Sequence, residues 1–244
     1  MLHYEGLIAD WYDDFLLDEH ADLDLYTELA AAQGGPALEL ACGTGRMLLA
    51  LHGAGIEADG VDISPDMLER CRAKAEAAGC SPELRLAPMQ KFTMDRRYRS
   101  VLVSGGSFQL LANAEDVASC LHCIREHLLP DGRLFLDVDV AEPACHAEWG
   151  IRRVAARGEE TFVYMSTNTY DSVLRCNVIR TRYELIRRSR VRKVIKDTIV
   201  MRVFSSEEMS MLLQQAGFVV LEVRPVQLFD SHPGSMLFIA GCLQ

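Results

Sequence analysis

Residues 38–45 read Leu-Glu-Leu-Ala-Cys-Gly-Thr-Gly, an apolar run that contains one acid and ends in two glycines. The run predicts a buried strand over 37–41, and the spacing that follows predicts a helix over 44–52. Glycines at the end of a strand let a ligand approach the backbone, and the N–H groups of the next helix point towards it. We therefore expect a ligand site at this turn, although a purely structural tight turn would give the same pattern.

Strands and helices continue to alternate after this turn. Further strands are predicted at 57–63, 84–88, 100–105 and 133–140, and further helices at 64–79 and 114–129. Ser64 is the expected N-cap of the helix over 64–79, with Pro65 in its first turn and Gly79 at its end. Elements of this length in this order imply parallel strands, so we expect a doubly wound, mostly parallel seven-stranded α/β sheet.

Two segments depart from this alternation. The first 35 residues have the three- and four-residue spacing of helices and are predicted to form a helical cap. After residue 150 the apolar period becomes two, which predicts an antiparallel, three-stranded β insert over 150–204. A helix capped by Ser205 or Ser206 and two final strands then follow. We expect one domain with a cap (1–35), a core (36–145 and 205–244) and the insert.

The charge is distributed unevenly. The 244 residues carry a formal net charge of −10, yet residues 151–204 hold 13 Lys and Arg against 5 Asp and Glu, a net +8, which leaves −18 for the rest. An acidic body repels a phosphate backbone, so nucleic acid is not an expected partner. The basic segment has three explanations: a solvated sheet face, contact with an acidic surface of a second copy in a homodimer, or attraction of an anionic substrate.

Hydropathy and cysteine placement favour a cytoplasmic protein. No run approaches the ~20 apolar residues of a membrane span, and the N-terminal residues do not resemble a signal peptide. Most of the eight cysteines lie in apolar or helical stretches, which indicates free thiols in a reducing compartment. A Cys-x-x-Cys pair at 120–123 lacks the second ligand pair of a zinc site, so no metal is expected.

A carboxylate follows the second predicted strand. Gly-Val-Asp-Ile-Ser (60–64) places Asp62 about 20 residues after the glycine turn, where it can accept hydrogen bonds from both hydroxyls of a ribose. The ligand is therefore expected to contain a nucleoside. The dinucleotide pattern G-x-G-x-x-G/A would need a small residue at Leu48, which disfavours a nicotinamide cofactor.

These stretches together resemble a known enzyme family. E-x-A-C-G-T-G (39–45), G-V-D-I-S-P-D-M-L (60–68) and L-L-P-D-G-R-L-F-L-D (128–137) are similar to successive motifs of class I S-adenosylmethionine-dependent methyltransferases. The resemblance is closest to the small-molecule branch of sugar N,N-dimethyltransferases and glycine or sarcosine methyltransferases, which also carry an antiparallel insert after the fifth strand.

The resemblance implies a Rossmann-like core that transfers a methyl group from S-adenosylmethionine to nitrogen or oxygen of a small molecule, by in-line displacement. The alternatives are a protein or nucleic-acid methyltransferase and a catalytically silent cofactor-binding scaffold. A thermal-shift experiment separates these possibilities from a dehydrogenase, because a dehydrogenase would be stabilised by NAD(H) and not by S-adenosylhomocysteine.

The resemblance also implies roles for individual residues. Glu39 would hold the methionine ammonium group, Asp62 the ribose hydroxyls, and Ile63 one face of the adenine. The implied cofactor-binding set is Glu39, Ala41, Gly43, Thr44, Gly45, Asp62, Ile63, Met67, Met89, Gln90, Ser104 and Gly105. Pro88 stands where the family commonly has an adenine-binding Asp, so Gln90 is the expected substitute.

No catalytic constellation is evident. The candidate catalytic residues are His146, as a base, and Tyr12, and the candidate acceptor contacts are Tyr4, Trp149 and Arg182. A neutral amine acceptor would need no base, whereas a hydroxyl or an acid would gain from one.

Overall fold

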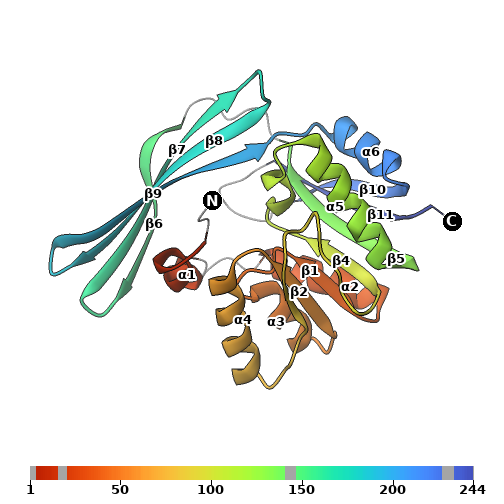
Figure 1. Ribbon diagram of the computed structural model, residues 1–244, viewed down its shortest axis with the longest axis horizontal. Helices are drawn as coiled ribbons and strands as arrows, with labels where there is room; N and C mark the ends of the chain where they lie inside the picture. The colour runs from red at the N-terminus through yellow and green to blue at the C-terminus, as the bar shows by residue number, and fades with distance from the viewer. Residues whose placement is uncertain (1–3, 16–20, 141–146, 227–233, 244) are drawn as a thin grey trace. The chain divides into compact units, whose positions relative to one another are not determined.

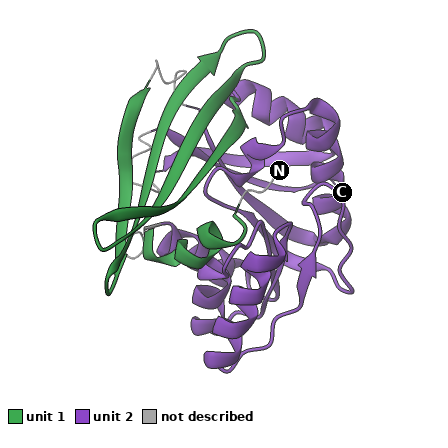
Figure 2. Ribbon diagram, turned by 60° about the vertical axis from the view of Figure 1, so that its left-hand side comes forward, with its two compact units in different colours: residues 1–18, 142–203 green, residues 19–141, 204–244 purple. Residues whose placement is uncertain are grey.

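The computed structural model describes residues 4–15, 21–140, 147–226 and 234–243 (Figure 1). The chain separates into two compact units, coloured in Figure 2: residues 1–18 with 142–203, called here the insert unit, and residues 19–141 with 204–244, called the core unit. The N-terminal segment predicted as one cap is thus divided between the two units. The predicted single-domain organisation stays a prediction.

The core unit is built on a seven-stranded sheet in the order β10-β11-β5-β4-β1-β2-β3. The strands are β1 (Ala37–Leu40), β2 (Ala58–Asp62), β3 (Leu84–Leu86), β4 (Tyr98–Val103), β5 (Leu128–Asp139), β10 (Phe218–Val226) and β11 (Ser235–Cys242). β1 to β5 are parallel, while β11 is antiparallel to both of its neighbours. The predicted fold class is confirmed, and the strand order reverses at β1, where open α/β sheets bind ligands.

Helices cover both faces of this sheet. They are α2 (Ala21–Gln33), α3 (Arg46–Gly53), α4 (Pro65–Ala77), α5 (Ala114–His127) and α6 (Ser206–Gln215), with a short 3₁₀ helix η2 (Ser107–Leu110) after β4. Leu38 and Leu40 of β1 pack in one cluster with side chains of α5 and α6, whereas Ala37 packs in another with α2 and α3. Alternate residues therefore enter opposite layers, so both faces of the strand are apolar apart from Glu39.

The predicted caps are present at two helices. The Ser64 hydroxyl accepts a hydrogen bond from the N–H of Met67 at 3.2 Å, and the Ser205 hydroxyl accepts one from Glu208 at 3.1 Å. α3 begins two residues later than predicted, at Arg46, because Gly45 has a left-handed backbone with φ 80° and ends the turn instead.

The insert unit holds a four-stranded antiparallel sheet: β6 (Ala147–Arg157), β7 (Glu160–Asp171), β8 (Cys176–Arg187) and β9 (Arg190–Arg202). The prediction of three strands is wrong by one. β6 was not predicted because the register of its pairing with β7 shifts twice, between Ala147 and Gly150 and between Ile151 and Arg153. Each shift interrupts the alternation of apolar and polar residues.

The first residues of the chain pack within the insert unit. α1 (Leu7–Trp11) and the 3₁₀ helix η1 (Asp13–Phe15) share an aromatic cluster with the sheet, in which Trp11 stacks on Phe162 with ring centroids 5.5 Å apart. Arg157 lies 4.3 Å above the Trp11 ring and pairs with Asp14. Across the described ranges, no helix combines the length and the apolar character needed to cross a bilayer.

Candidate functional site

The glycine turn after β1 uses a left-handed backbone at three positions. Ala41 has φ 56°, Gly43 φ 55° and Gly45 φ 80°. This conformation costs an alanine about 1 kcal/mol, and such strain is found mainly at functional sites. A Cβ on Gly45 would lie 2.4 Å from the Sγ of Cys71, whereas one on Gly43 would meet nothing within 4 Å. Packing thus requires glycine at 45, while the space beside Gly43 is open to a ligand.

Asp62 closes the turn from the end of β2. One carboxylate oxygen accepts from the N–H of Gly43 at 2.8 Å and the other from the N–H of Ser64 at 2.8 Å. Burial raises the pKa of Asp62, and these backbone hydrogen bonds oppose the shift. A carboxylate has about four acceptor positions, so Asp62 can both hold the turn and accept from a ligand hydroxyl.

Glu39 lies within β1 and is 4% exposed. Its Oε2 is buried and has no hydrogen-bond partner among the described residues. Burial raises the pKa of Glu39 well above its usual value, and Arg46 only partly opposes this. Arg46 is committed to Asp22, since Nη1 donates to Oδ1 at 2.8 Å and Nη2 to the other oxygen. A buried carboxylate oxygen without a partner is costly, so Oε2 is the polar atom of this strand whose desolvation the described residues do not offset.

Apolar side chains lie exposed at the same edge of the sheet. Ile63, directly after β2, is 70% exposed, and Leu86, at the end of β3, is 55% exposed. Leu86 is paired in register with Asp62, and it is an apolar neighbour of this site that was not predicted beside Ile63, Met67 and Met89. The pair offers the apolar surface on which an aromatic ring would stack.

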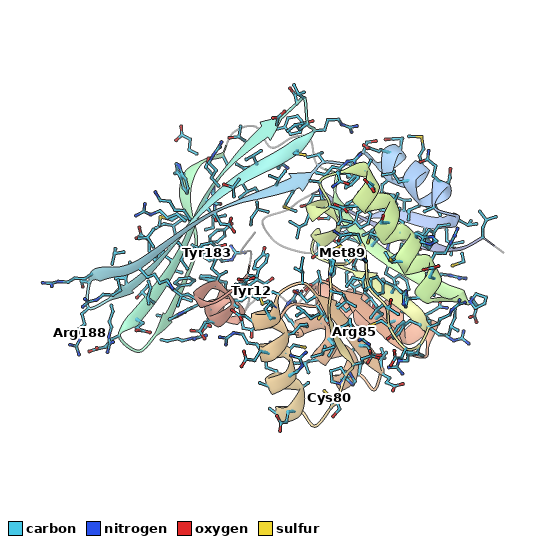
Figure 3. The ribbon with its side chains drawn as sticks, viewed as in Figure 1. Tyr12, Cys80, Arg85, Met89, Tyr183 and Arg188 are labelled. Atoms are coloured by element: carbon cyan, nitrogen blue, oxygen red, sulfur yellow. The ribbon has the colours of Figure 1, made fainter. Side chains whose placement is uncertain are left out.

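The remaining predicted residues of the core unit differ in their surroundings. Met67 is buried, and Met89, labelled in Figure 3, is partly buried against the larger core cluster. The backbone carbonyl of Gln90 accepts from the Cys123 thiol at 3.4 Å. Thr44 is buried and accepts from Lys74 Nζ at 3.0 Å.

The segment after β4 is held by an aspartate that the sequence analysis did not name. Asp137 of β5 is 1% exposed and accepts from the N–H groups of Gly105 at 3.0 Å and Gly106 at 2.8 Å. The hydroxyl of Tyr26 in α2 donates to it as well. Burial raises the pKa of Asp137 to about 6, against these hydrogen bonds. The sequence signal was an acid inside an apolar strand, the same signal that marked Glu39.

The predicted acceptor and catalytic residues do not lie in the core unit. Tyr4 and Tyr12 belong to the insert unit, where their rings meet edge to face at 5.5 Å. Trp149 is 55% exposed there, and Arg182 pairs with Glu184 at 2.5 Å. His146 lies outside the described residues. The roles predicted for these residues stay predictions.

Comparison with known sequences identifies the segment that carries this site. Residues 37–132 match the family described as a methyltransferase domain. The chain contains a methyltransferase domain. The match begins with β1, includes Glu39, the glycine turn and Asp62, and ends five residues before Asp137.

Two curated relatives are methyltransferases of Streptomyces. The dTDP-3-amino-3,6-dideoxy-alpha-D-glucopyranose N,N-dimethyltransferase of Streptomyces fradiae is 30% identical over 148 residues, which cover 57% of this chain and 54% of the relative. The cypemycin N-terminal methyltransferase of a Streptomyces species is 34% identical over 113 residues, 45% of this chain and 44% of the relative. The chain thus spans about half the length of the curated relatives that it matches.

Solved structures share the fold over nearly the whole chain. An S-adenosylmethionine-dependent methyltransferase from Clostridium acetobutylicum has a TM-score of 0.79 at 15% identity, covering 97% of this chain and 98% of that one. The resemblance of the methyltransferase domain to the class I S-adenosylmethionine-dependent family is confirmed, and S-adenosylmethionine is the cofactor of that family.

Proposed function

We propose that this methyltransferase transfers the methyl group of S-adenosylmethionine to an amino group of a small molecule. The observation that carries the proposal is the unpartnered Oε2 of Glu39, buried beside the glycine turn where the strand order reverses. The cofactor has an ammonium group on its methionine part, and a desolvated carboxylate oxygen is the complementary partner for it.

The other groups at this edge fit the rest of the cofactor. Asp62 would accept from the ribose hydroxyls while it holds Gly43, and Ile63 and Leu86 would face the adenine with apolar surface. The segment that begins at Ser104 and Gly105 would border the methionine end. The side chain of Pro88 cannot accept a hydrogen bond from the adenine amino group. We therefore assign this contact to the side-chain carbonyl of Gln90.

The bound cofactor supplies an activated methyl group on a sulfonium. The chain then has to fix the cofactor, align the acceptor and exclude water, because positive charge disperses during the displacement. A neutral amine can accept the methyl group without prior loss of a proton. The names of the two relatives, one of an amino-sugar N,N-dimethyltransferase and one of an N-terminal methyltransferase, support nitrogen as the acceptor atom.

The insert unit supports finer proposals. We assign acceptor contacts to Tyr4, Trp149 and Arg182, and a base, if the acceptor needs one, to His146 or Tyr12. The basic charge of residues 151–204 supports either an anionic acceptor or a homodimer in which this insert meets the acidic surface of a second copy. The free cysteines of the described chain are consistent with the proposed cytoplasmic location.

Calorimetric titration with S-adenosylhomocysteine, followed by transfer assays with labelled cofactor, tests the proposal. We expect binding, transfer to an amino sugar or a small amine, and a more than tenfold loss of affinity in Asp62→Ala, because a hydrogen-bonded carboxylate is lost. Asp131→Asn, an exposed site paired with Arg99, is the control and should bind as the parent does.

Each other outcome has a definite meaning. No binding of S-adenosylhomocysteine would overturn the proposal. Binding without transfer to any acceptor would favour the silent scaffold, and transfer to nucleic acid or protein would favour that alternative class.

A further inference from the structure

We propose that Asp137 and Tyr26 are a positioning pair for the cofactor site: the ionised carboxylate of Asp137 holds Gly105 and Gly106 in the form that binds the S-adenosyl group, and protonation of Asp137 releases them. The inference rests on the proposed function. Neither residue is placed in contact with the cofactor, so both would act through the glycine segment.

The geometry concentrates three donors on one buried carboxylate. The N–H groups of Gly105 and Gly106 donate at 3.0 and 2.8 Å, and the Tyr26 hydroxyl donates to the same oxygen as Gly105. Both glycines have a left-handed backbone, with φ 66° and 68°. Glycine adopts this backbone and others with similar ease, so the hydrogen bonds to the carboxylate select one conformation of a segment that can take several.

The segment lies at the edge of the sheet that carries the glycine turn. Leu102 of β4 pairs with Glu39 of β1 on one side, and Val103 pairs with Leu136 of β5 on the other. Gly105 and Gly106 follow β4 after one residue, Ser104, so they lie at the same carboxyl edge of the sheet as the residues after Glu39. A shift in their backbone therefore changes the border of the proposed methionine site.

The groups around Asp137 make its charge sensitive to pH. On its own strand, Asp139 raises the pKa of Asp137 by repulsion, although burial is the larger cause. From α2, Tyr26 donates to it, and Asp22 raises the pKa of Tyr26 in turn. Asp22 is itself paired with Arg46 of α3. From η2 and the segment before it, Asp137 receives only backbone N–H groups.

Proton uptake would break part of this arrangement. A protonated carboxyl becomes a donor at one oxygen and a weaker acceptor at the other, so at least one glycine N–H loses its partner. Because the pKa of Asp137 is about 6, the change falls just below neutral pH. Tyr26→Phe removes a donor that favours the ionised form, so it moves the change to higher pH.

The test follows the amide resonances of Gly105 and Gly106 by nuclear magnetic resonance from pH 5 to 8 in the whole chain. In parallel, calorimetry measures S-adenosylhomocysteine affinity over the same range. We expect both amides to titrate with a midpoint near pH 6 and the midpoint to rise by about one unit in Tyr26→Phe, the usual effect of one hydrogen bond to a charged group. S-adenosylhomocysteine affinity at pH 6.5 should then fall about threefold or more in this variant.

Tyr98→Phe is the matched control. It removes the same kind of bond, a tyrosine hydroxyl to a buried aspartate (Asp59) at 2.8 Å, at the opposite end of the sheet. It should leave both the midpoint and the affinity unchanged. Glu39 titrates at the site as well, so the difference between the two variants, rather than the parent curve alone, is decisive. Asp137→Asn should abolish the amide titration.

Two results would overturn the inference: amides that do not titrate, or a midpoint that moves in Tyr26→Phe without any change in affinity. If S-adenosylhomocysteine does not bind at any pH, the proposed function fails. In that case the amide titration still shows whether Asp137 controls the glycines, so the two failures are distinguishable.

Discussion

The two ends of the parallel sheet each bury an aspartate that accepts a hydrogen bond from a tyrosine hydroxyl, but among the residues that the structure describes a cation pairs with only one of them. At the amino ends, Asp59 is 3% exposed and accepts from Tyr98 at 2.8 Å and from the N–H of Glu83 at 2.8 Å. Arg96 completes this set with Nη2 at 2.7 Å. At the carboxyl ends, within the described part of the chain, Asp137 receives hydroxyl and N–H donors without a cation, and Oε2 of Glu39 has no partner.

The contrast separates the end of the sheet whose buried aspartate is paired within the chain from the end that we propose binds the cofactor. A cation and hydrogen-bond donors within the chain offset the desolvation cost of a buried carboxylate. Without a cation, that cost remains until a cationic ligand binds. The left-handed Ala41 lies at the same carboxyl end. Strain, raised carboxyl pKa values and an unpartnered oxygen thus coincide at one edge, as they do at functional sites in general.

The largest effect is expected from Glu39→Gln. If Glu39 binds the cofactor ammonium group, the loss of its charge should weaken S-adenosylhomocysteine binding about a hundredfold, roughly 3 kcal/mol. The free protein should be no less stable to urea, because the variant removes a buried acid whose pKa is raised. Calorimetry and urea unfolding measure the two quantities. Unchanged affinity would break the comparison, because Oε2 of Glu39 would then be a buried oxygen that gains no partner from the ligand either.

Proton release on binding of S-adenosylhomocysteine gives a second test of the role of Glu39. The raised pKa of Glu39 means that the folded, ligand-free state holds a proton more tightly than an ordinary glutamate. An ammonium group bound beside it would lower that pKa again, so binding should release protons. Calorimetry in buffers of different ionisation enthalpy should show this release in the parent and lose it in Glu39→Gln.

A smaller effect of the opposite kind is expected from Arg96→Ala. This change leaves Asp59 buried without its cation, so the free energy of unfolding should fall by about 2 kcal/mol; we discount the usual cost because Asp59 keeps two donors and Arg96 is partly exposed. Urea unfolding measures the loss. S-adenosylhomocysteine affinity should not change, and a parallel loss of affinity would show that the two ends are not separate.

The smallest effect compares one substitution at both ends. A Cβ on Gly132 would lie 3.0 Å from the carbonyl oxygens of Leu129 and Tyr98, and Gly43 has φ 55°, so alanine at either position should cost about 1 kcal/mol of stability. Only Gly43→Ala should also reduce S-adenosylhomocysteine affinity, severalfold, since only its Cβ enters the space proposed for the ligand. Equal affinities in the two variants would contradict that assignment.

The sequence predicted the parts of this molecule that depend on local pattern. The glycine turn, Asp62 after the second strand and the caps at Ser64 and Ser205 all follow from residues within a few positions of one another. Glu39 was recognised because an acid in an apolar strand is rare, and the motif around it carries a family resemblance. The same reasoning could have marked Asp137, which lies between two apolar residues of β5, Leu136 and Val138.

The rest depends on contacts between distant segments. Tyr26 and Asp137 are 111 residues apart, so no spacing rule connects them. The division of the N-terminal residues between the two units likewise depends on which sheet each helix meets, since Trp11 packs on Phe162 while Tyr26 packs in the core unit. The strand of the insert that was not predicted, β6, has two register shifts in its pairing with β7, and residue propensities do not reveal such shifts.

The register of β11 has a consequence for how the chain folds. In the insert unit, two-residue turns such as Arg188-Ser189, with φ 50° and 59°, join neighbouring strands, so these hairpins can form from local contacts. By contrast, the pairing of Asp139 with Ser235 closes a loop that contains the entire insert sheet. Loop-closure entropy grows with length and non-local pairing slows folding. We therefore expect the seven-stranded sheet to acquire its β5–β11 pairing late, after the inserted hairpins are in place.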